Sequence, residues 1–226
     1  MGNNDARIGG LAAVFIAVAY LVAIPYFVVY VDYPSLTDPT AKLALLAEHY
    51  SSMYAMHVLV YELVAVALVV LTLALHERCR ARAGIIATFA AAIGLTWSAL
   101  LLASSMVFNY GMGVSLRLSE AAPERAVWMW QVVEAVAQGI GGAGGELLGG
   151  LWTLFVSLAA RAADALPSAP VRLGLVIGVT GLASCIPVLR NLGIAFGLLQ
   201  IVWFAWVGAI LLRTPHGERL AHPVAM

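Results

Sequence analysis

The chain has 226 residues, of which 62% are hydrophobic and 11% are charged. A soluble domain carries about 25% charged residues, because water contacts its whole surface, so this composition excludes a water-soluble globular protein. Twelve basic and twelve acidic side chains give no net charge, which argues against nucleic acid as a partner.

Six apolar stretches are long enough to cross a hydrocarbon layer about 30 Å thick, which requires roughly 20 helical residues. They lie near residues 8–31, 52–75, 84–108, 126–160, 171–189 and 192–212. Backbone polar groups in lipid must be satisfied within helices or closed barrels, and these runs lack the alternation of barrel strands. The sequence therefore predicts an all-α, polytopic transmembrane bundle of about six helices that forms a single domain over residues 1–226.

The first of these stretches, residues 8–31, is longer than the core of a signal peptide, which has about 7 to 15 residues. No small-residue cleavage site follows it, so we expect it to remain as the first span. The two cysteines, Cys79 and Cys185, are predicted near opposite membrane faces. They are therefore not expected to form a disulfide or a metal site within the chain.

Basic residues divide unequally between the two sides of the predicted bundle. The side of the termini carries Arg7, Arg78, Arg80, Arg82, Arg161, Arg172, Arg213 and Arg219, and the other side carries Lys42, Arg117, Arg125 and Arg190. Cytoplasmic loops of membrane proteins are enriched in Lys and Arg. The chain is therefore predicted to be a multi-pass protein of the plasma (inner) membrane with both termini in the cytoplasm. The six tryptophans are expected mostly near the membrane interfaces.

Several short motifs recur in one known family. Residues 6–11 read Ala-Arg-Ile-Gly-Gly-Leu, an Asp-Pro loop precedes the second span, and a Leu-Pro turn at 166–167 leads to Arg-Leu-Gly at 172–174. With these motifs, nearly the whole chain resembles a bacterial family of six-span integral membrane proteins catalogued only as a domain of unknown function. The usual family loop, Leu-Pro-x-Trp-Leu-Gly, carries an insertion here. The resemblance implies the six-span topology and no activity.

Charged side chains at membrane depth are the exceptional features, because each costs roughly 3 kcal/mol even on lenient insertion scales. The candidates are Glu62, Glu134 and Glu146. The fourth span carries two of them and is too long for one crossing, because at about 1.5 Å per residue it would reach roughly 52 Å. On a continuous helix, Gln131, Glu134, Gln138 and Glu146 share one face about 120° wide with several glycines.

Two interpretations of this fourth span remain open. In the first, Gly141, Gly145 and Gly149 allow close helix contact, and the glutamates are protonated or bonded to neighbours. In the second, the glycine cluster at 139–145 breaks the helix, and freed backbone groups around Glu146 line a site at mid-depth, as in many transporters.

The second span places Tyr54, His57 and Tyr61 on one face near its outer half. A haem or copper site needs ligands from further helices, and no other span offers a histidine, so we expect no metal and no cofactor. His57 is expected either to hydrogen-bond tyrosines or a glutamate in the bundle, or to form a proton relay with Glu134. Glu62 lies about 140° around the helix from His57 and is expected to face a different neighbour.

No nucleophilic triad, phosphate loop or zinc motif occurs in the sequence, so no catalytic residue is assigned. The leading hypothesis is a non-enzymatic helical bundle that binds membrane lipid or another apolar ligand, or serves as a subunit of a homo-oligomer or of a complex with another membrane protein. The second is a small proton-coupled transporter that uses Glu134, Glu146 and His57. The third is an intramembrane enzyme with a glutamate as acid or base.

Overall fold

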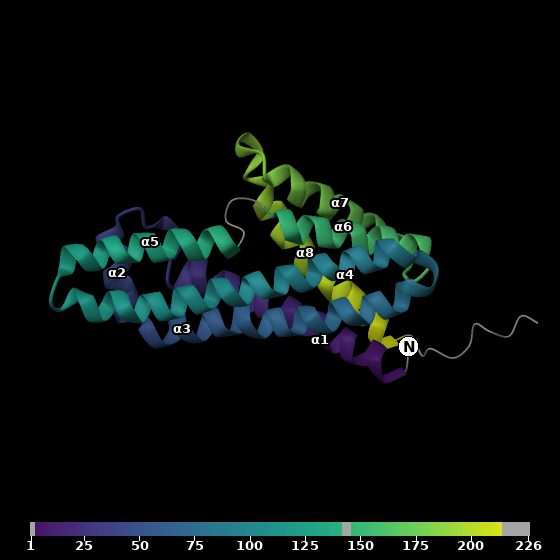
Figure 1. Cartoon of the computed structure of the whole chain (residues 1–226), viewed down its shortest axis with the longest axis horizontal. Coiled ribbons are helices and arrows are strands. Elements are labelled where there is room, and N and C mark those ends of the chain that lie inside the picture. The colour runs from purple at the N-terminus through teal and green to yellow at the C-terminus, as the bar shows by residue number, and fades with distance from the viewer. Residues whose placement is uncertain (1–2, 142–145, 214–226) are drawn as a thin grey trace, which may run out of the picture.

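The computed structural model describes residues 3–141 and 146–213, and no strand occurs among them, which confirms the predicted all-α bundle. The helices are α1 (Asn3–Pro25), η1 (Tyr26–Tyr30), η2 (Tyr33–Ser35), α2 (Pro39–Glu48), α3 (Tyr50–His57), η3 (Val58–Leu63), α4 (Val64–Ser119), α5 (Pro123–Gly141), α6 (Leu147–Ala162), α7 (Ser168–Ser184), η4 (Pro187–Leu189) and α8 (Leu192–Arg213) (Figure 1). Two of them, η1 and η3, are π-helical continuations of the α-helices before them.

The long helix α4 reverses direction at Gly84 (Figure 1). Gly84 has a φ of +44°, a conformation that L side chains rarely adopt. We call residues 50–83 the first leg and residues 85–119 the second leg. Their antiparallel pairing is visible where His76 Nδ1 lies 3.2 Å from the carbonyl oxygen of Ala87. The predicted second and third spans are these two legs.

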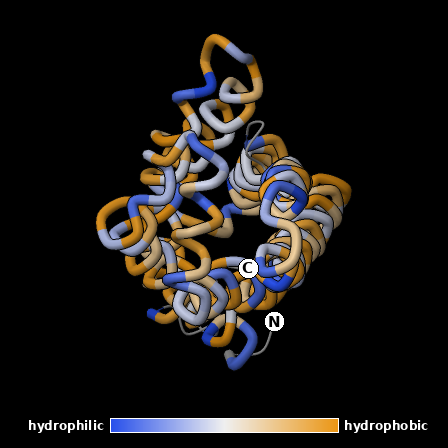
Figure 2. The backbone as a smooth tube through the Cα atoms, turned by 90° about the vertical axis from the view of Figure 1, so that its left-hand side faces the viewer, coloured by the Kyte–Doolittle hydropathy of each residue, from blue (hydrophilic) through white to orange (hydrophobic). Residues whose placement is uncertain are grey.

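Within the described part of the chain, three helical segments are long and apolar enough to cross a membrane. They are Asn4–Tyr30, Tyr50–Ser119 and Leu192–Arg213, and two shorter apolar helices are Leu147–Ala162 and Ser168–Ser184. Hydrophobic residues surround most of the helices in the end-on view of Figure 2, and hydrophilic residues are confined to short stretches. These features are those of a membrane protein.

The predicted fourth span, 126–160, is not one helix. α5 ends at Gly141, α6 begins at Leu147, and Glu146 before it has a non-helical backbone (φ −83°, ψ 54°). Glycine is a poor helix former, so a glycine-rich segment interrupts a helix at little cost. Residues 142–145 of the glycine cluster lie outside the described residues. The break puts Glu146 on a different helix from Glu134, so the single polar face expected for a continuous helix is wrong.

α7 ends at Ser184, before the predicted end of the fifth span at residue 189. Pro187 lacks a backbone N–H and cannot continue the helical hydrogen bonding, and the short helix η4 starts at this residue. α6 and α7 approach closely because glycines line their contact: a Cβ on Gly178 would meet Leu154, and one on Gly150 would meet the backbone of Gly181.

Buried apolar side chains form two separate clusters. The larger one joins α1, both legs, α6, α7 and α8, and the rings of Trp152 and Trp203 meet at its centre, 5.7 Å apart. The smaller one, which we call the distal core, lies between α2, α3, α5 and the end of the second leg. Trp130, Trp152 and Trp203 are fully buried in these clusters. These three tryptophans therefore pack inside the protein, whereas Trp128 is exposed, and the expected interfacial position of the tryptophans stays a prediction.

The start of α1, the end of α8 and the reversal at Gly84 lie at one end of the molecule, which we call the proximal end (Figure 1). The side chains of Arg78 and Arg82 donate to the carbonyl oxygens of Ala165 (2.8 Å) and Ala163 (3.3 Å) in the α6–α7 turn. The segments at this end (the start of α1, the helix around Gly84, the α6–α7 turn and the end of α8) carry Arg7, Arg78, Arg80, Arg82, Arg161, Arg172 and Arg213 in the sequence. Arg219 lies outside the described residues.

The reversal at Gly84 gives a test of the fold. A Cβ at Gly84 would meet nothing within 4 Å, so Gly84→Ala acts through backbone strain alone and should lower the free energy of unfolding by about 1 kcal/mol. The measurement is the thermal stability of the purified protein in detergent. Gly139→Ala, also without neighbours within 4 Å but inside α5, should leave stability equal or raise it. Equal loss in both variants would contradict the positive φ at Gly84.

Candidate functional site

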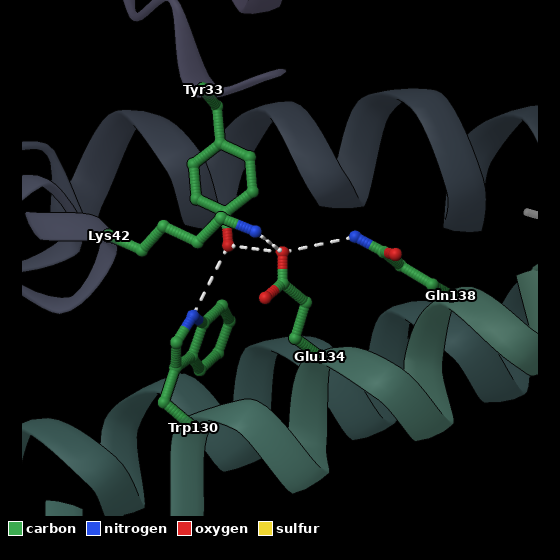
Figure 3. A network of polar contacts seen from close by, with 5 residues as sticks. All are labelled: Tyr33, Lys42, Trp130, Glu134 and Gln138. Carbon is green, nitrogen blue, oxygen red and sulfur yellow. Dashed lines mark hydrogen bonds and ion pairs between the residues drawn. The ribbon is translucent and has the colours of Figure 1, made fainter. Parts of the chain in front are cut away.

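Glu134 of α5 is the centre of a polar network in the distal core (Figure 3). Its side chain is buried, and Oε1 accepts hydrogen bonds from Lys42 Nζ (2.6 Å), Tyr33 OH (2.9 Å) and Gln138 Nε2 (3.1 Å). Trp130 Nε1 in turn donates to Tyr33 OH at 3.2 Å. A buried carboxylate is tolerated when it is paired with an opposite charge and hydrogen-bonded, and Glu134 meets both conditions.

The loop before the first leg carries two of the partners of Glu134. Asp38 caps the N-terminus of α2, because its side chain accepts from the backbone N–H groups of Thr40 and Ala41. This cap starts the helix one turn before Lys42, whose Nζ lies 5.1 Å from the centre of the Tyr33 ring. The cation therefore contacts an aromatic face as well as the carboxylate.

Burial and the neighbouring Glu134 carboxylate raise the pKa of the Tyr33 phenol well above its usual value. Each of these effects disfavours the phenolate. The hydroxyl of Tyr33 therefore stays protonated at neutral pH and serves as a donor to Glu134 while it accepts from Trp130.

His57 lies in an aromatic sandwich. Its ring stacks between Phe108, with centroids 3.5 Å apart, and Tyr61, at 5.1 Å, and the Phe27 ring meets it edge-on at 5.7 Å. The expected hydrogen bond to a tyrosine or a glutamate is not found among the described residues, and the buried Nδ1 has no hydrogen-bond partner. The histidine thus packs against the rings and makes no direct hydrogen bond to Glu134.

The π-helical segment η3 starts directly after His57 and contains Tyr61 and Glu62. Such wide turns occur frequently at functional sites. Glu62 Oε1 accepts a hydrogen bond from Ser105 Oγ of the second leg at 3.1 Å. His57 stacks on Phe108, three residues further along the same leg, so both side chains contact the second leg and the expectation of a different neighbouring helix for Glu62 is not met.

Glu146 lies at the break of the fourth span. Its backbone N–H donates to Ser184 Oγ at 3.0 Å, and the Ser184 hydroxyl donates to the carbonyl oxygen of Gly181 at 2.6 Å. The phenols of Tyr20 and Tyr61 are close enough to interact electrostatically with its carboxylate. Within residues 3–141 and 146–213, no hydrogen bond to that carboxylate is present.

The structure sorts the sequence-predicted residues into two groups. Glu134 and Gln138 belong to the distal network, whereas Tyr61 lies against Gly141 at the end of α5, on the other side of the break from Glu146. Of the other four, His57 and Glu62 have the separate contacts described above, and Gln131 and Tyr54 have exposed side chains and join neither group.

Sequence reasoning missed three residues of the distal network: Tyr33, Lys42 and Trp130. The available signal was the predicted helix start at Asp38-Pro39-Thr40, which places Lys42 in the first turn of a helix beside the bundle.

No group of three or more His, Cys, Asp or Glu side chains that could hold a metal ion occurs in the part of the chain that the structure describes. Comparisons of the chain with family models, with curated proteins and with solved structures find no match. The resemblance to the six-span family stays a prediction. A functional proposal therefore depends on the geometry of the Glu134 network and of the break at Glu146.

The Lys42–Glu134 pair gives a second test. Lys42→Met leaves a buried carboxylate without its cation and should lower the free energy of unfolding by about 2 to 3 kcal/mol. The double variant Lys42→Met/Glu134→Gln should lose clearly less than the sum of the two single losses, which a double-mutant cycle in detergent measures. Arg80→Gln, which breaks the exposed pair with Glu77, should change little. Strict additivity of the two network variants would show that the charges are not coupled.

Proposed function

We propose that the chain is a multi-pass, non-enzymatic protein of the bacterial inner membrane that binds an apolar or lipid-like ligand at Glu146. One observation carries the proposal: Glu146 lies at the break of the fourth span, within electrostatic range of the phenols of Tyr20 and Tyr61. The other acid of the fourth span, Glu134, is already occupied by Lys42 and two neutral donors.

The distribution of basic residues supports an orientation with the proximal end in the cytoplasm. Seven of the ten described arginines are on the segments at this end, in line with the enrichment of Lys and Arg in cytoplasmic loops. In this orientation the chain crosses the membrane through α1, the two legs, the broken fourth span, α7 and α8, and both termini are cytoplasmic. The distal core then faces the outside.

The length of the second leg supports different membrane depths for the two glutamates. At about 1.5 Å per residue, Phe108 lies roughly 36 Å from Gly84 and Trp97 roughly 20 Å from it. The Glu134 network is at the level of Phe108, because Trp130 contacts that ring at 5.0 Å. Glu146 precedes Gly149, which packs against Trp97. With hydrocarbon about 30 Å thick, Glu146 lies inside it, and Glu134 lies at its outer boundary.

The chemistry around Glu146 suits the polar group of an otherwise apolar molecule. A carboxyl group and two phenols offer both donors and acceptors to a hydroxyl or amine. Ligand sites are mostly apolar with few polar groups that fix orientation, and a carboxyl group inside a membrane is a functional feature by default. The distal network holds α5 against α2, so that the helix before the break has a fixed position.

Removal of the Glu146 carboxyl group tests this proposal. The protein is purified in mild detergent, and native mass spectrometry records the apolar molecules that co-purify with it. Glu146→Leu should reduce their amount about tenfold, because one charge-assisted hydrogen bond contributes roughly 1.5 kcal/mol. Glu120→Gln, which changes an exposed carboxylate in the α4–α5 turn, should retain them. An unchanged set of bound molecules in Glu146→Leu would contradict the proposal.

A second candidate function is proton-coupled transport. The observation that favours it is again the interrupted helix, because transporter sites near the bilayer midplane are typically formed by broken helices. Of the residues suggested by the sequence, only Glu146 suits this role in the structure, since Lys42 neutralises Glu134 and aromatic rings enclose His57.

Proteoliposomes that contain a pH-sensitive dye test the transport candidate. Glu146→Gln should abolish proton movement while the protein elutes as a folded particle, because an amide cannot exchange the proton. Glu134→Gln should leave proton movement in place. Movement at the unmodified rate in Glu146→Gln would remove this second function.

A further inference from the structure

A pocket of about 300 Å³ opens at the proximal end, between the last turn of α6 and the first turns of α7. Arg161, Asp164, Ser168 and Arg172 form its polar side, and Leu166, Val171 and Leu175 form its apolar side. None of these residues belongs to the distal network or to the surroundings of Glu146. The pocket is therefore a separate feature of the molecule.

The packing of α6 against α7 brings the two arginines of the pocket together. Ser157 lies against Gly174 and Leu154 against Gly178, which fixes the antiparallel register of the two helices. In this register, Arg161 at the end of α6 is level with Arg172 near the start of α7. Both side chains are exposed and line the same pocket.

The guanidinium groups of Arg161 and Arg172 have no ion pair among the described residues. Asp164 lines the pocket too, and its carboxylate lies more than 4.0 Å from both arginines. Arg82, by contrast, is used within the protein, because it donates to the carbonyl oxygen of Ala163. Two cations against one carboxylate give the pocket a net positive charge.

The first turn of α7 adds to this positive potential. Pro167 precedes the helix and provides no side-chain cap, so the backbone N–H groups of Ser168 and Ala169 point toward the end of the helix without a helical acceptor. The N-terminal end of the helix dipole favours an anion at the same place. The Ser168 hydroxyl is a further donor at the pocket wall.

We propose that this pocket binds the phosphate group of an anionic phospholipid, with Arg161 and Arg172 as its charged partners. Guanidinium groups match phosphate oxygens in geometry and charge, and basic pockets between transmembrane helices on the cytoplasmic side bind anionic head groups. The apolar side favours a lipid over free phosphate, because the exposed side chains of Val176 and Val179 continue along α7 from Leu175. An acyl chain can lie along this row.

Lipid titration of the full chain in neutral detergent tests the site. Native mass spectrometry counts bound dioleoylphosphatidylglycerol, and dioleoylphosphatidylcholine and inorganic phosphate are titrated in parallel. Phosphatidylglycerol should bind, and its apparent Kd should rise about fivefold for Arg161→Gln or Arg172→Gln and about 25-fold for both. Arg80→Gln/Arg213→Gln removes two charges from the same end outside the pocket and should leave the Kd within about twofold.

Ser168→Glu separates binding from folding. A carboxylate in the first turn stabilises α7 and repels phosphate from the pocket, so this variant should melt no lower than the unmodified protein and still bind phosphatidylglycerol at least tenfold more weakly. Several outcomes would overturn the assignment: equal weakening by the Arg80/Arg213 control, equal binding of phosphatidylcholine, or displacement of the lipid by millimolar inorganic phosphate. None of them affects the role of Glu146.

Discussion

Hydrocarbon offers no hydrogen-bond partner to a polar group, and this constraint governs where the charges of the chain lie. The carboxylate of Glu134 is buried only because Lys42 and Tyr33 reach it from the loop before the first leg. Glu62 accepts from Ser105 on the facing leg. Around the broken fourth span, the N–H of Glu146 finds the Ser184 hydroxyl in place of a helical carbonyl. In these three places a polar group in the bundle is matched by a partner from another segment of the chain.

Helix contacts in the rest of the bundle depend on small residues, since lipid tails are as apolar as the side chains and provide no hydrophobic drive between helices. Gly208 of α8 lies against Val14 and the backbone of Gly10 in α1. Gly94 of the second leg leaves room for Thr72 and Trp152. Large rings occupy the space that glycines leave: the Trp203 indole lies against Gly174, and its N–H donates to the carbonyl oxygen of Pro170 at 3.0 Å.

Hydropathy alone was sufficient to predict the all-α class of the chain, because a run of apolar residues of membrane length has few other stable forms. It was not sufficient for the fourth span. There the apolar character favours one long helix, whereas the low helix propensity of glycine favours a break. The distal network could not be predicted for another reason: Lys42 and Glu134 are 92 residues apart in the chain. A loop lysine looks the same in sequence whether it faces water or folds back onto a helix. His57 was expected to be a hydrogen-bonding group, and the rings that enclose it come from three separate helices.

The contacts of Arg78 and Arg82 with the α6–α7 turn have a consequence for biogenesis. The turn is synthesised 87 and 81 residues after these arginines. In the proposed orientation, the same positive charges would retain their loop on the cytosolic side while the first two crossings insert. Once the α6–α7 hairpin has been synthesised, the two arginines donate hydrogen bonds to its turn. These bonds hold it against the hairpin that the two legs form. In that orientation, the same two side chains would first direct topology and afterwards stabilise the tertiary contact between the two hairpins.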